Sequence, residues 1–264
     1  MKIFTKIKSV SKRVNKKIKR SLNLKNTKTN IAERHKIDVY SPAGDFKLLF
    51  HDLKSKGFQC KYILDVGAHT ASWIRIAMDV FPESKAFLIE PLEEMEDKLR
   101  QFCIDYPGSK YFLKGAGALN QTLPLTVGGV LEGANFLQDK NDYFKSVNKQ
   151  REIEIITIDS LINNKEIEIP DIVKLDIQGF ELEALKGATS LFGKSEVFFI
   201  EISFFEFLKG IPIFSEVVIF MAERGYEVYD FTGFLRRPSD NSLAQTDVCF
   251  VKRDGFFRSS DNWE

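Results

Sequence analysis

Short apolar runs recur between residues 62 and 252, and apolar residues at helical spacing fill most of the intervals between them. A helical pattern that ends at Gly57 precedes the first run. The runs predict strands at Tyr62–Val66, Ala86–Glu90, Lys110–Ala116, Glu152–Ile158, Ile172–Ile177, Val197–Ile202, Tyr226–Tyr229 and Val248–Lys252. Strands that alternate with helices predict an α/β fold with a mainly parallel, doubly wound sheet.

One segment interrupts this alternation. Between Ala116 and Arg151 a short apolar run is surrounded by Gly128, Gly129 and Gly133. Glycines in this arrangement are typical of turns, so we expect a hairpin or a cap over the site.

The end of the first predicted strand carries a candidate binding motif. Asp65 and Gly67 lie between the apolar run and residues that can start a helix, an arrangement that leaves backbone N–H groups beside a cleft. Glu90 ends the next strand about 25 residues later, where a carboxylate can accept hydrogen bonds from both ribose hydroxyls. This order of elements predicts a nucleoside site, although an ordinary turn explains the first motif alone equally well.

The glycine pattern narrows the choice of nucleoside. Dinucleotide sites need Gly-x-Gly-x-x-Gly, but Gly67 is followed by Ala68, His69, Thr70, Ala71 and Ser72. This sequence argues against NAD and FAD. A single glycine after an acid fits a cofactor that carries an amino acid in place of phosphates, and S-adenosylmethionine is the common one.

A second motif follows the fifth predicted strand. Asp176 lies at the end of an apolar run, Gly179 supplies a turn, and Phe180, Leu182 and Leu185 recur near helical spacing. Asp176 and Glu181 should therefore flank the cleft at the carboxyl edge of the sheet, where open α/β sheets bind their ligands.

Several of these segments resemble the FkbM-type methyltransferases over roughly residues 40 to 252. The segment Asp-Ile-Gln-Gly-Phe-Glu-Leu-Glu-Ala-Leu-Lys-Gly-Ala, residues 176–188, is similar to the motif after the cofactor site of that family. The Asp-Val-Gly-Ala of residues 65–68 with Trp73 resembles its first motif, and residues 158–161 and 245–252 resemble further landmarks.

The resemblance implies a class I methyltransferase (Rossmann-like) fold, S-adenosylmethionine as methyl donor and, usually, a hydroxyl oxygen as acceptor. The cofactor-binding residues it implies are Asp65, Gly67, Ala68, His69, Thr70, Ser72, Glu90, Ala116 and Asp176. Two positions depart from the family: His69 stands where Asn is usual, and Ala71 where Gly is frequent. An imidazole still makes one hydrogen bond, so tuning of the site and neutral drift both remain open.

A hydroxyl acceptor needs a proton acceptor or a metal ion near it. The candidate catalytic residues are Asp176, Glu181 and Glu201, of which Glu201 ends the run Val-Phe-Phe-Ile-Glu. Asp176 and Glu201 could share a proton or hold Mg²⁺ with hard oxygen ligands. The alternative is that both cap turns or bind the amino group of the cofactor. Phe204, Phe205 and Phe207 could line an acceptor pocket, although core packing explains most of the 24 phenylalanines.

Length and composition set the domain organisation. A chain of 264 residues with 44% hydrophobic and 28% charged side chains can bury one core, so we expect a tail over residues 1–36 and one methyltransferase domain over residues 37–264. The three cysteines and three histidines are scattered, which argues against a zinc site or disulfides and favours the cytoplasm. The sequence has no apolar run of about 18 residues, so we expect no transmembrane helix.

Charge is distributed unevenly along the chain. Residues 1–30 carry eleven Lys or Arg and no acid, so the remaining 27 basic side chains stand against 37 acidic ones, a net charge of −10. Apolar residues in this tail recur at three- and four-residue steps, at Ile3, Ile7, Val10, Val14, Ile18 and Leu22. Such a helix could lie on an anionic membrane. A disordered arm, a helix packed on the acidic body and a mitochondrial presequence are the alternatives.

Three functions stay open at this point. The leading hypothesis is an O-methyltransferase acting on a glycan or small molecule. An RNA methyltransferase would use the basic tail for phosphate contacts, but the motifs of base methylation are absent and we do not expect a nucleic-acid partner. The third hypothesis is a non-catalytic scaffold that keeps the fold.

Overall fold

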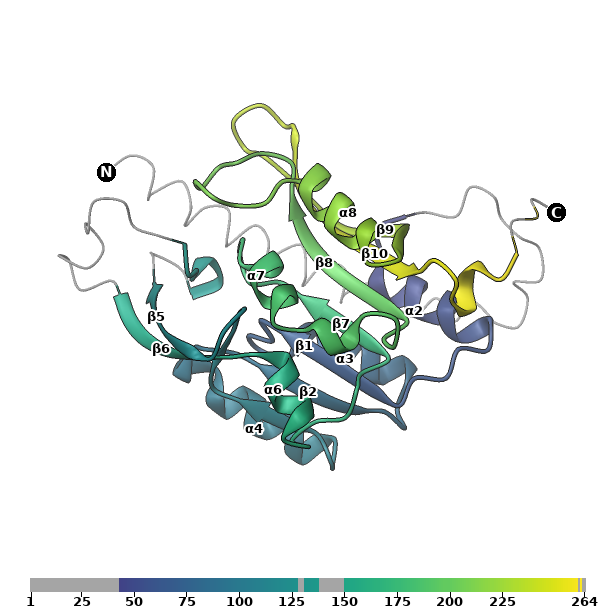
Figure 1. The fold of residues 1–264 in the computed structure, drawn as a ribbon, viewed down its shortest axis with the longest axis horizontal. Coiled ribbons are helices and arrows are strands. Elements are labelled where there is room, and N and C mark those ends of the chain that lie inside the picture. Colours follow the sequence, from purple (N-terminus) through teal and green to yellow (C-terminus); the bar gives the residue numbers. More distant parts are fainter. Residues whose placement is uncertain (1–42, 128–130, 138–149, 261, 263–264) are drawn as a thin grey trace, which may run out of the picture.

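The computed structural model describes residues 43–127, 131–137, 150–260 and 262 (Figure 1). In this part of the chain seven strands form one sheet in the order β3-β2-β1-β7-β8-β10-β9. The strands are β1 (Tyr62–Val66), β2 (Lys85–Ile89), β3 (Lys110–Phe112), β7 (Ile172–Leu175), β8 (Val197–Ser203), β9 (Tyr226–Arg236) and β10 (Leu243–Lys252). The predicted tail over residues 1–36, with its apolar stripe, lies outside the described residues.

The pairing of the strands confirms a mainly parallel sheet. β1 pairs in parallel with β2 on one side and with β7 on the other, and β7 pairs in parallel with β8. Only β10 among these strands runs antiparallel, to both β8 and β9. The chain order therefore reverses between β1 and β7, and in open α/β sheets ligands bind at this reversal, outside the carboxyl ends of the strands.

Helices cover both faces of the sheet, so the doubly wound arrangement is confirmed (Figure 1). One face packs on α2 (Phe46–Ser55), α3 (Ser72–Val80) and α4 (Glu96–Asp105); the other packs on α6 (Ile158–Asn163), α7 (Glu181–Lys186) and α8 (Phe214–Glu223). Successive residues of a strand alternate between the two cores: Phe199 packs toward α2 and α3, and Phe198 toward the other face. The helix predicted before the first strand is α2, which ends at Ser55.

The segment that interrupts the alternation forms a separate sheet. Its strands β4 (Gly115–Ala116), β5 (Gln121–Thr126) and β6 (Gln150–Ile156) lie in the order β4-β6-β5. β5 and β6 pair antiparallel, which confirms the predicted hairpin, although Gly128 and Gly129 lie outside the described residues.

Two strand predictions in this region were wrong. The single strand expected over Lys110–Ala116 is divided between β3 of the large sheet and β4 of the small one. The strand expected to reach Ile158 ends at Ile156, because the side chain of Thr157 caps α6 by accepting a hydrogen bond from the Ser160 N–H at 3.0 Å.

The last two strands are longer than predicted. β9 continues to Arg236 and β10 starts at Leu243, so the two form a hairpin that projects at the top of Figure 1. Register shifts between Leu243 and Asp247 interrupt the regular pairing of this hairpin. These irregularities explain why the alternating pattern is lost in the sequence there.

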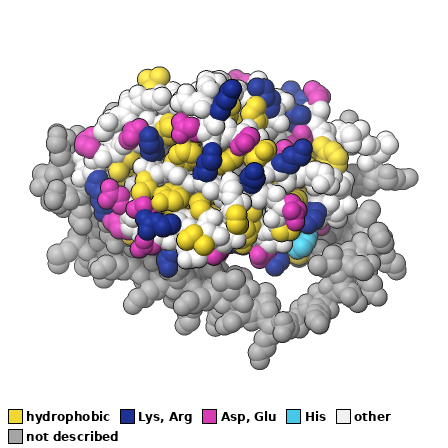
Figure 2. Space-filling view, turned by 90° about the horizontal axis from the view of Figure 1, so that it is seen from below, with side chains coloured by type: hydrophobic (Ala, Val, Ile, Leu, Met, Phe, Trp, Pro, Cys, Tyr) yellow, Lys and Arg dark blue, Asp and Glu magenta, His cyan; other side chains and the backbone are white. Residues whose placement is uncertain are grey.

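The surface seen in Figure 2 carries Lys and Arg side chains interspersed with Asp and Glu, so this face has no field of one sign. Within the described ranges, no helix is both long enough and apolar enough to cross a membrane.

Candidate functional site

The turn after β1 is held tightly between its two neighbouring strands. The N–H groups of Gly67 and Ala68 both donate to the Ile89 carbonyl at the end of β2, at 2.9 and 3.2 Å. Gly67 has φ +83°, and a Cβ at this position would lie 2.0 Å from the backbone oxygen of Asp176 after β7. Only glycine satisfies both the conformation and the space.

The two departures from the family pattern occur where the backbone is left-handed. His69 has φ +46° and Ala71 has φ +58°, immediately before α3. Asn and Gly are the residues that adopt this conformation at the lowest cost, which explains why they are usual there. His69 and Ala71 therefore hold a conformation that Asn or Gly would adopt at lower cost, and the chain accepts strain at these two positions.

Glu90 joins the ends of β1 and β2. Its Oε2 atom accepts a hydrogen bond from the His69 N–H at 2.8 Å, and its Oε1 atom accepts one from the Leu92 N–H at 3.0 Å. The side chain is buried, and burial raises the pKa of Glu90 to about 7 although both hydrogen bonds oppose the rise. Each oxygen keeps a second lone pair with which it can accept a ligand hydroxyl.

Asp65 lies on β1 and is completely buried. In the described part of the chain neither of its carboxylate oxygens has a hydrogen-bond partner. Burial raises the pKa of Asp65 to about 6, against the opposing charge of Lys174. A buried carboxylate without donors is uncommon and calls for a partner, such as a bound molecule.

Lys174 lies opposite Asp65 on β7 and is only 4% exposed. Its Nζ atom is 2.9 Å from Oδ2 of Asp176 and 5.6 Å from the ring centroid of Trp73. Burial by itself would lower the pKa of Lys174, but the carboxylates of Asp176, Asp65 and Asp247 outweigh it and raise the pKa above its ordinary value. The lysine is therefore a fixed positive charge among carboxylates.

Asp176, just after the end of β7, and Glu201, near the end of β8, lie side by side. The amide Nε2 of Gln178 donates to Oδ1 of Asp176 at 3.0 Å and to Oε2 of Glu201 at 2.8 Å. Gln178 has φ +55°, a strained conformation that places its side chain between the two acids. Asp247 on β10 is directly opposite Glu201.

The two acids of this pair titrate in opposite directions. Burial opposes ionisation of Asp176, but the charge and hydrogen bond of Lys174, together with hydrogen bonds from Gln178 and Glu201, lower its pKa. Burial, followed by the charges of Asp176 and Asp247, raises the pKa of Glu201 well above its ordinary value. Two adjacent carboxyl groups with pKa values moved apart share one proton, as in acid–base pairs of enzymes.

Glu181 has a different environment from the other two predicted catalytic acids. Its Oε1 atom accepts hydrogen bonds from the N–H groups of Ile177 at 3.0 Å and Gly179 at 3.1 Å, and the residue is buried. Burial raises the pKa of Glu181 to about 7. The carboxylate thus holds the turn that positions Gln178, while its role as a base stays a prediction.

The other predicted cofactor residues divide by exposure. Thr70 and Ser72 are exposed at the start of α3, whereas Ala68 and Ala116 are buried in the core. The Nε2 atom of His69 is buried without a partner among the described residues, and burial lowers the pKa of His69. The turn after β1 therefore offers both an exposed edge and an unpaired imidazole nitrogen.

Sequence reasoning assigned no role to four polar residues of the site, although three of them lie in the quoted motifs: Trp73, Lys174, Gln178 and Asp247. A lysine inside an apolar strand and an aspartate in the run of residues 245–252 were the available signals. The atoms Nε1 of Trp73 and Oδ1 of Asp247 are buried and unpaired within the described ranges. Together with the Asp65 carboxylate and the His69 Nε2 atom, these two atoms form a set of buried polar atoms that reaches from β1 to β10 and has no partners in the described part of the chain.

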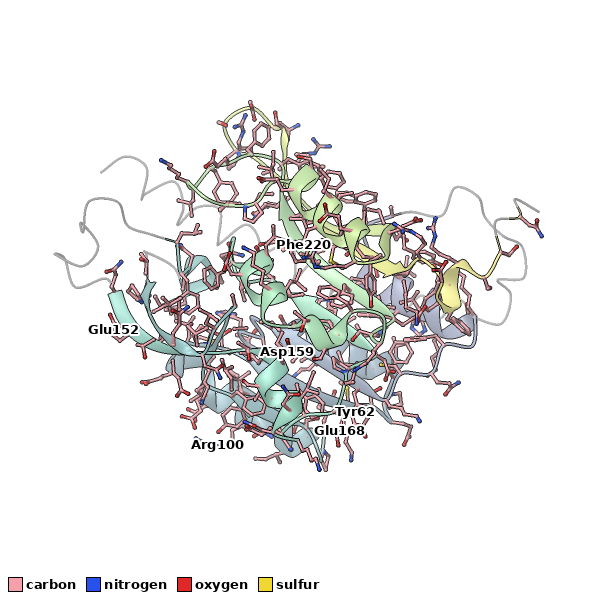
Figure 3. All side chains as sticks on the ribbon, viewed as in Figure 1. Tyr62, Arg100, Glu152, Asp159, Glu168 and Phe220 are labelled. Carbon is pink, nitrogen blue, oxygen red and sulfur yellow. The ribbon has the colours of Figure 1, made fainter. Side chains whose placement is uncertain are left out.

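The landmark at residues 158–161 has a structural role. Asp159, labelled in Figure 3, accepts hydrogen bonds from the N–H groups of Thr189 and Ser190, each at 2.8 Å. These contacts connect the start of α6 to the 3₁₀ turn η4 (Thr189–Leu191).

The magnesium interpretation gains no support from the contacts. The part of the chain that the structure describes contains no group of three or more His, Cys, Asp or Glu side chains that could hold a metal ion. Asp176 instead accepts hydrogen bonds from Lys174 and Gln178, and Glu201 accepts one from Gln178.

Comparison with known proteins places these motifs in context. The family described as "Methyltransferase FkbM domain" matches residues 65–228. No curated protein matches the chain.

The similar solved structures are distant from this chain. Precorrin-6y C5,15-methyltransferase from Geobacter metallireducens is 14% identical, with 78% of this chain and 88% of that chain covered and a TM-score of 0.42. The 1,6-didemethyltoxoflavin-N1-methyltransferase of Burkholderia thailandensis is 9% identical, with 78% and 76% covered and a TM-score of 0.43. M. jannaschii TYW2 is 10% identical, with 81% and 80% covered and a TM-score of 0.40.

Proposed function

Because the chain belongs to the FkbM methyltransferase family, we propose that it transfers a methyl group from S-adenosylmethionine to a hydroxyl oxygen of a glycan or another small molecule. The match covers residues 65–228, which include both site motifs. The sheet, with antiparallel β10 between β8 and β9, is that of the class I methyltransferase fold. The family and the fold make the chain an S-adenosylmethionine-dependent methyltransferase, and the hydroxyl acceptor is the proposed part.

The residues around the turn after β1 suit this cofactor. The unpaired carboxylate of Asp65 and the unpaired Nε2 of His69 can take hydrogen bonds from a bound polar molecule, which would satisfy them. Glu90 keeps lone pairs for ribose hydroxyls at the end of β2. Gly67, Thr70 and Ser72 contribute backbone and hydroxyl groups on the accessible side of the turn. When bound, the cofactor supplies an activated methyl group on a sulfonium.

The observation that carries the proposal is the Asp176–Glu201 pair. An acceptor hydroxyl is a poor nucleophile until a neighbouring group takes its proton. Asp176, which Lys174 keeps ionised, can accept a hydrogen bond that orients the hydroxyl. Glu201 holds the proton that the pair shares and must first release it to solvent; once it is ionised, Glu201 is the stronger base of the pair, because its pKa is raised. We therefore assign the proton of the acceptor hydroxyl to Glu201.

The test has two stages. Purified protein is first incubated with donor labelled in its methyl group and with sugars, lipid-linked glycans and hydroxylated small molecules. The Glu201→Gln variant is then compared on the acceptor that is methylated. We expect turnover to fall by about 10²–10⁴-fold, the range for loss of a general base, while cofactor affinity stays unchanged.

Glu223→Gln is the matched control, since Glu223 is an exposed acid at the end of α8. Both variants should keep the wild-type circular dichroism spectrum. Full activity of Glu201→Gln on the true acceptor would contradict the assignment. Activity that withstands a chelator would exclude a role for magnesium.

A further inference from the structure

Two loops meet at one end of the sheet. Residues 204–213 follow β8, and residues 237–242 connect β9 to β10; both project at the top of Figure 1. The N–H of Phe204 donates to the Ala244 carbonyl at 2.8 Å, and the guanidinium of Arg237 lies 4.1 Å from the ring centroid of Phe205. The two loops therefore form one unit, which we call the loop tip (residues 204–213 and 234–243).

The loop tip exposes large apolar side chains. Phe207 is 51% exposed, Leu208 is 42% exposed and Phe234 is 49% exposed. Within the described residues, these are three of the seven large apolar side chains with such exposure. Several apolar side chains exposed on two joined, protruding loops are typical of an interaction surface, whereas single exposed ones are common on any protein.

In the loop tip the acidic side chains are hydrogen-bonded within the loops, whereas two of the basic side chains form no ion pair with the described residues. Its two acids are used within the loops: Glu206 accepts from the Gly210 N–H at 3.0 Å, and Asp240 accepts from the Ser242 N–H at 3.0 Å and pairs with Arg237. Lys209 has no partner among the described residues, and Arg236 donates only to the backbone carbonyl of Asn241 at 2.9 Å. Positive charge is thus left to face outward beside the apolar side chains.

The start of the described chain lies beside the same hairpin. Gly44 forms a bridge to Thr232 of β9, and a Cβ at Gly44 would lie 3.0 Å from the ring of Phe234. The sequence that precedes this point holds eleven Lys or Arg and no acid within residues 1–30. The described chain therefore begins beside the loop tip, and the basic residues 1–30 precede it in the sequence.

We propose that the loop tip binds the surface of an anionic lipid bilayer, with Phe207, Leu208 and Phe234 entering the interface and Lys209 and Arg236 contacting lipid head groups. Exposed apolar side chains suit the acyl-chain boundary of such a surface, and the cations beside them suit its anionic head groups. A protein partner would need complementary acids and a fitted apolar groove, and nothing in the shape of two projecting loops selects one.

The loop tip is also continuous with the acceptor end of the site. Ile211, in the same loop, is buried, and a Cβ at Gly179 would lie 2.6 Å from its Cγ1 atom, next to Gln178. Glu201 lies on β8 just before the loop, and Asp247 lies on β10 four residues after Leu243. An acceptor held in the bilayer would then approach Asp176 and Glu201 directly, a consequence that rests on the proposed function.

The proposal is tested by tryptophan fluorescence of the full chain with lipid vesicles. Phe207→Trp and Phe234→Trp are compared with Phe256→Trp, since Phe256 is 48% exposed in the 3₁₀ turn η5 (Phe256–Arg258), away from the loop tip (Figure 1). The vesicles contain phosphatidylglycerol and phosphatidylcholine with brominated acyl chains, which quench only tryptophans in the bilayer. The signal of the unsubstituted chain, from Trp73 and Trp263, is subtracted.

We expect quenching at positions 207 and 234 to exceed quenching at position 256 several-fold, and to disappear in vesicles of phosphatidylcholine alone. Lys209→Gln and Arg236→Gln should each weaken vesicle binding about fivefold at low salt, as one charge near an anionic surface is worth about 1 kcal/mol. Equal quenching at the three positions, even if the chain sediments with vesicles, would overturn the proposal. Self-association through the loop tip without quenching would also overturn it.

No methyl transfer is needed for this measurement, so its failure is distinguishable from failure of the proposed function. Binding of S-adenosylmethionine to each variant, measured by calorimetry, shows that the fold is retained.

Discussion

Replacing Lys174 by methionine should destabilise the protein in a manner that depends on pH. Methionine has nearly the shape of lysine without the charge, so the substitution removes the Nζ contact to Asp176 at 2.9 Å and leaves the packing of β7 nearly unchanged. The lysine is 4% exposed, so water cannot replace it as a partner. Removing one member of a fully buried ion pair costs about 3–5 kcal/mol, and the cost here is smaller because the Asp176 side chain is 32% exposed.

The structure sets an upper limit on this loss. Asp176 can avoid an unpaired charge by binding a proton, which costs 1.36 kcal/mol for each pH unit above its ordinary pKa of about 3.9. At pH 7 this route costs about 4 kcal/mol, and at pH 5 about 1.5 kcal/mol. Because Asp176 keeps some contact with water, we expect a loss of about 2–3 kcal/mol at pH 7 and no more than about 1.5 kcal/mol at pH 5.

The sign follows from the direction of the pKa shift. In the wild type the pKa of Asp176 is lowered, so its contribution to stability is present above the unfolded pKa and is lost as the pH falls. In the variant the pKa of Asp176 is raised by burial without Lys174, so the folded state binds the proton and loses stability as the pH rises above about 4. The difference between the two proteins must therefore grow from pH 5 to pH 7.

The free energy of unfolding is measured by urea denaturation at both pH values with far-UV circular dichroism. Trp73 fluorescence is unsuitable, because the Lys174 Nζ lies 5.6 Å from the Trp73 ring centroid. Lys47→Met is the matched control: Lys47 and Asp79 are 3.9 Å apart and both more than half exposed, so this variant should lose less than about 1 kcal/mol at either pH.

A double variant separates charge from packing. Adding Asp176→Asn to Lys174→Met removes the group that is closest to the lysine, so the pH dependence of the loss should become smaller between pH 5 and pH 7. The part that remains comes from Asp65 and Asp247, whose pKa values Lys174 also lowers. An equal loss at pH 5 and pH 7 in the single variant, or a loss below about 1 kcal/mol at pH 7, would refute the electrostatic account of the cluster.

Two further predictions concern the donor end of the site. Glu90→Gln should weaken binding of S-adenosylmethionine by roughly 1–3 kcal/mol in calorimetry. The affinity of the wild type should rise with pH through about 7 as Glu90 ionises. Glu90→Gln should lose this pH dependence, and the exposed control Glu83→Gln should keep it. Gly67→Ala should lower the free energy of unfolding by more than about 3 kcal/mol in urea denaturation, since its Cβ would lie 2.0 Å from the Asp176 carbonyl oxygen. Gly193→Ala is the control, with φ +77° and no atom within 4 Å of the added Cβ, and should cost only about 1 kcal/mol. Equal losses in the two variants would contradict the steric argument.

The parts of the site that the sequence predicts are those that depend on local order. Asp65, Gly67 and Glu90 each lie at the end of an apolar run, and the alternation of strands and helices determines that these ends share one edge of the sheet. Glu201 could be placed beside Asp176 for the same reason, once the class I order was assumed. Their contacts with cofactor and acceptor stay predictions.

The small sheet shows where local pattern fails. β5 contains Pro124, a residue that argues against a central strand because it cannot donate a hydrogen bond to a neighbour. β5 is an edge strand in the order β4-β6-β5, and an edge tolerates proline. A strand lies at an edge because of its pairing with strands far away in the sequence, and the pattern within one segment does not reveal that pairing.

Lys174 illustrates the same limit for chemistry. In the sequence it is a polar interruption of an apolar strand, and its meaning depends on Asp65, more than a hundred residues earlier, and on Asp247, far later in the chain. Asp65, Lys174, Asp176, Glu201 and Asp247 come together only because β1, β7, β8 and β10 are adjacent. Gln178 is hidden for another reason: its position between two acids requires a left-handed backbone that few residues other than glycine adopt.

The strand order also explains why one lysine influences both ends of the site. Side chains alternate between the faces of a strand, so Lys174 and Asp176 point to the same side of β7, and their register neighbours Asp65 and Phe199 share that face. β7 lies between β1, which leads to the cofactor turn, and β8, which leads to Glu201. A charge on β7 therefore acts on Asp65 on one side and on the Asp176–Glu201 pair on the other. A bound donor that stabilises the ionised form of Asp65 would keep its negative charge close to Asp176, so cofactor binding and the ionisation of the acceptor pair should be linked.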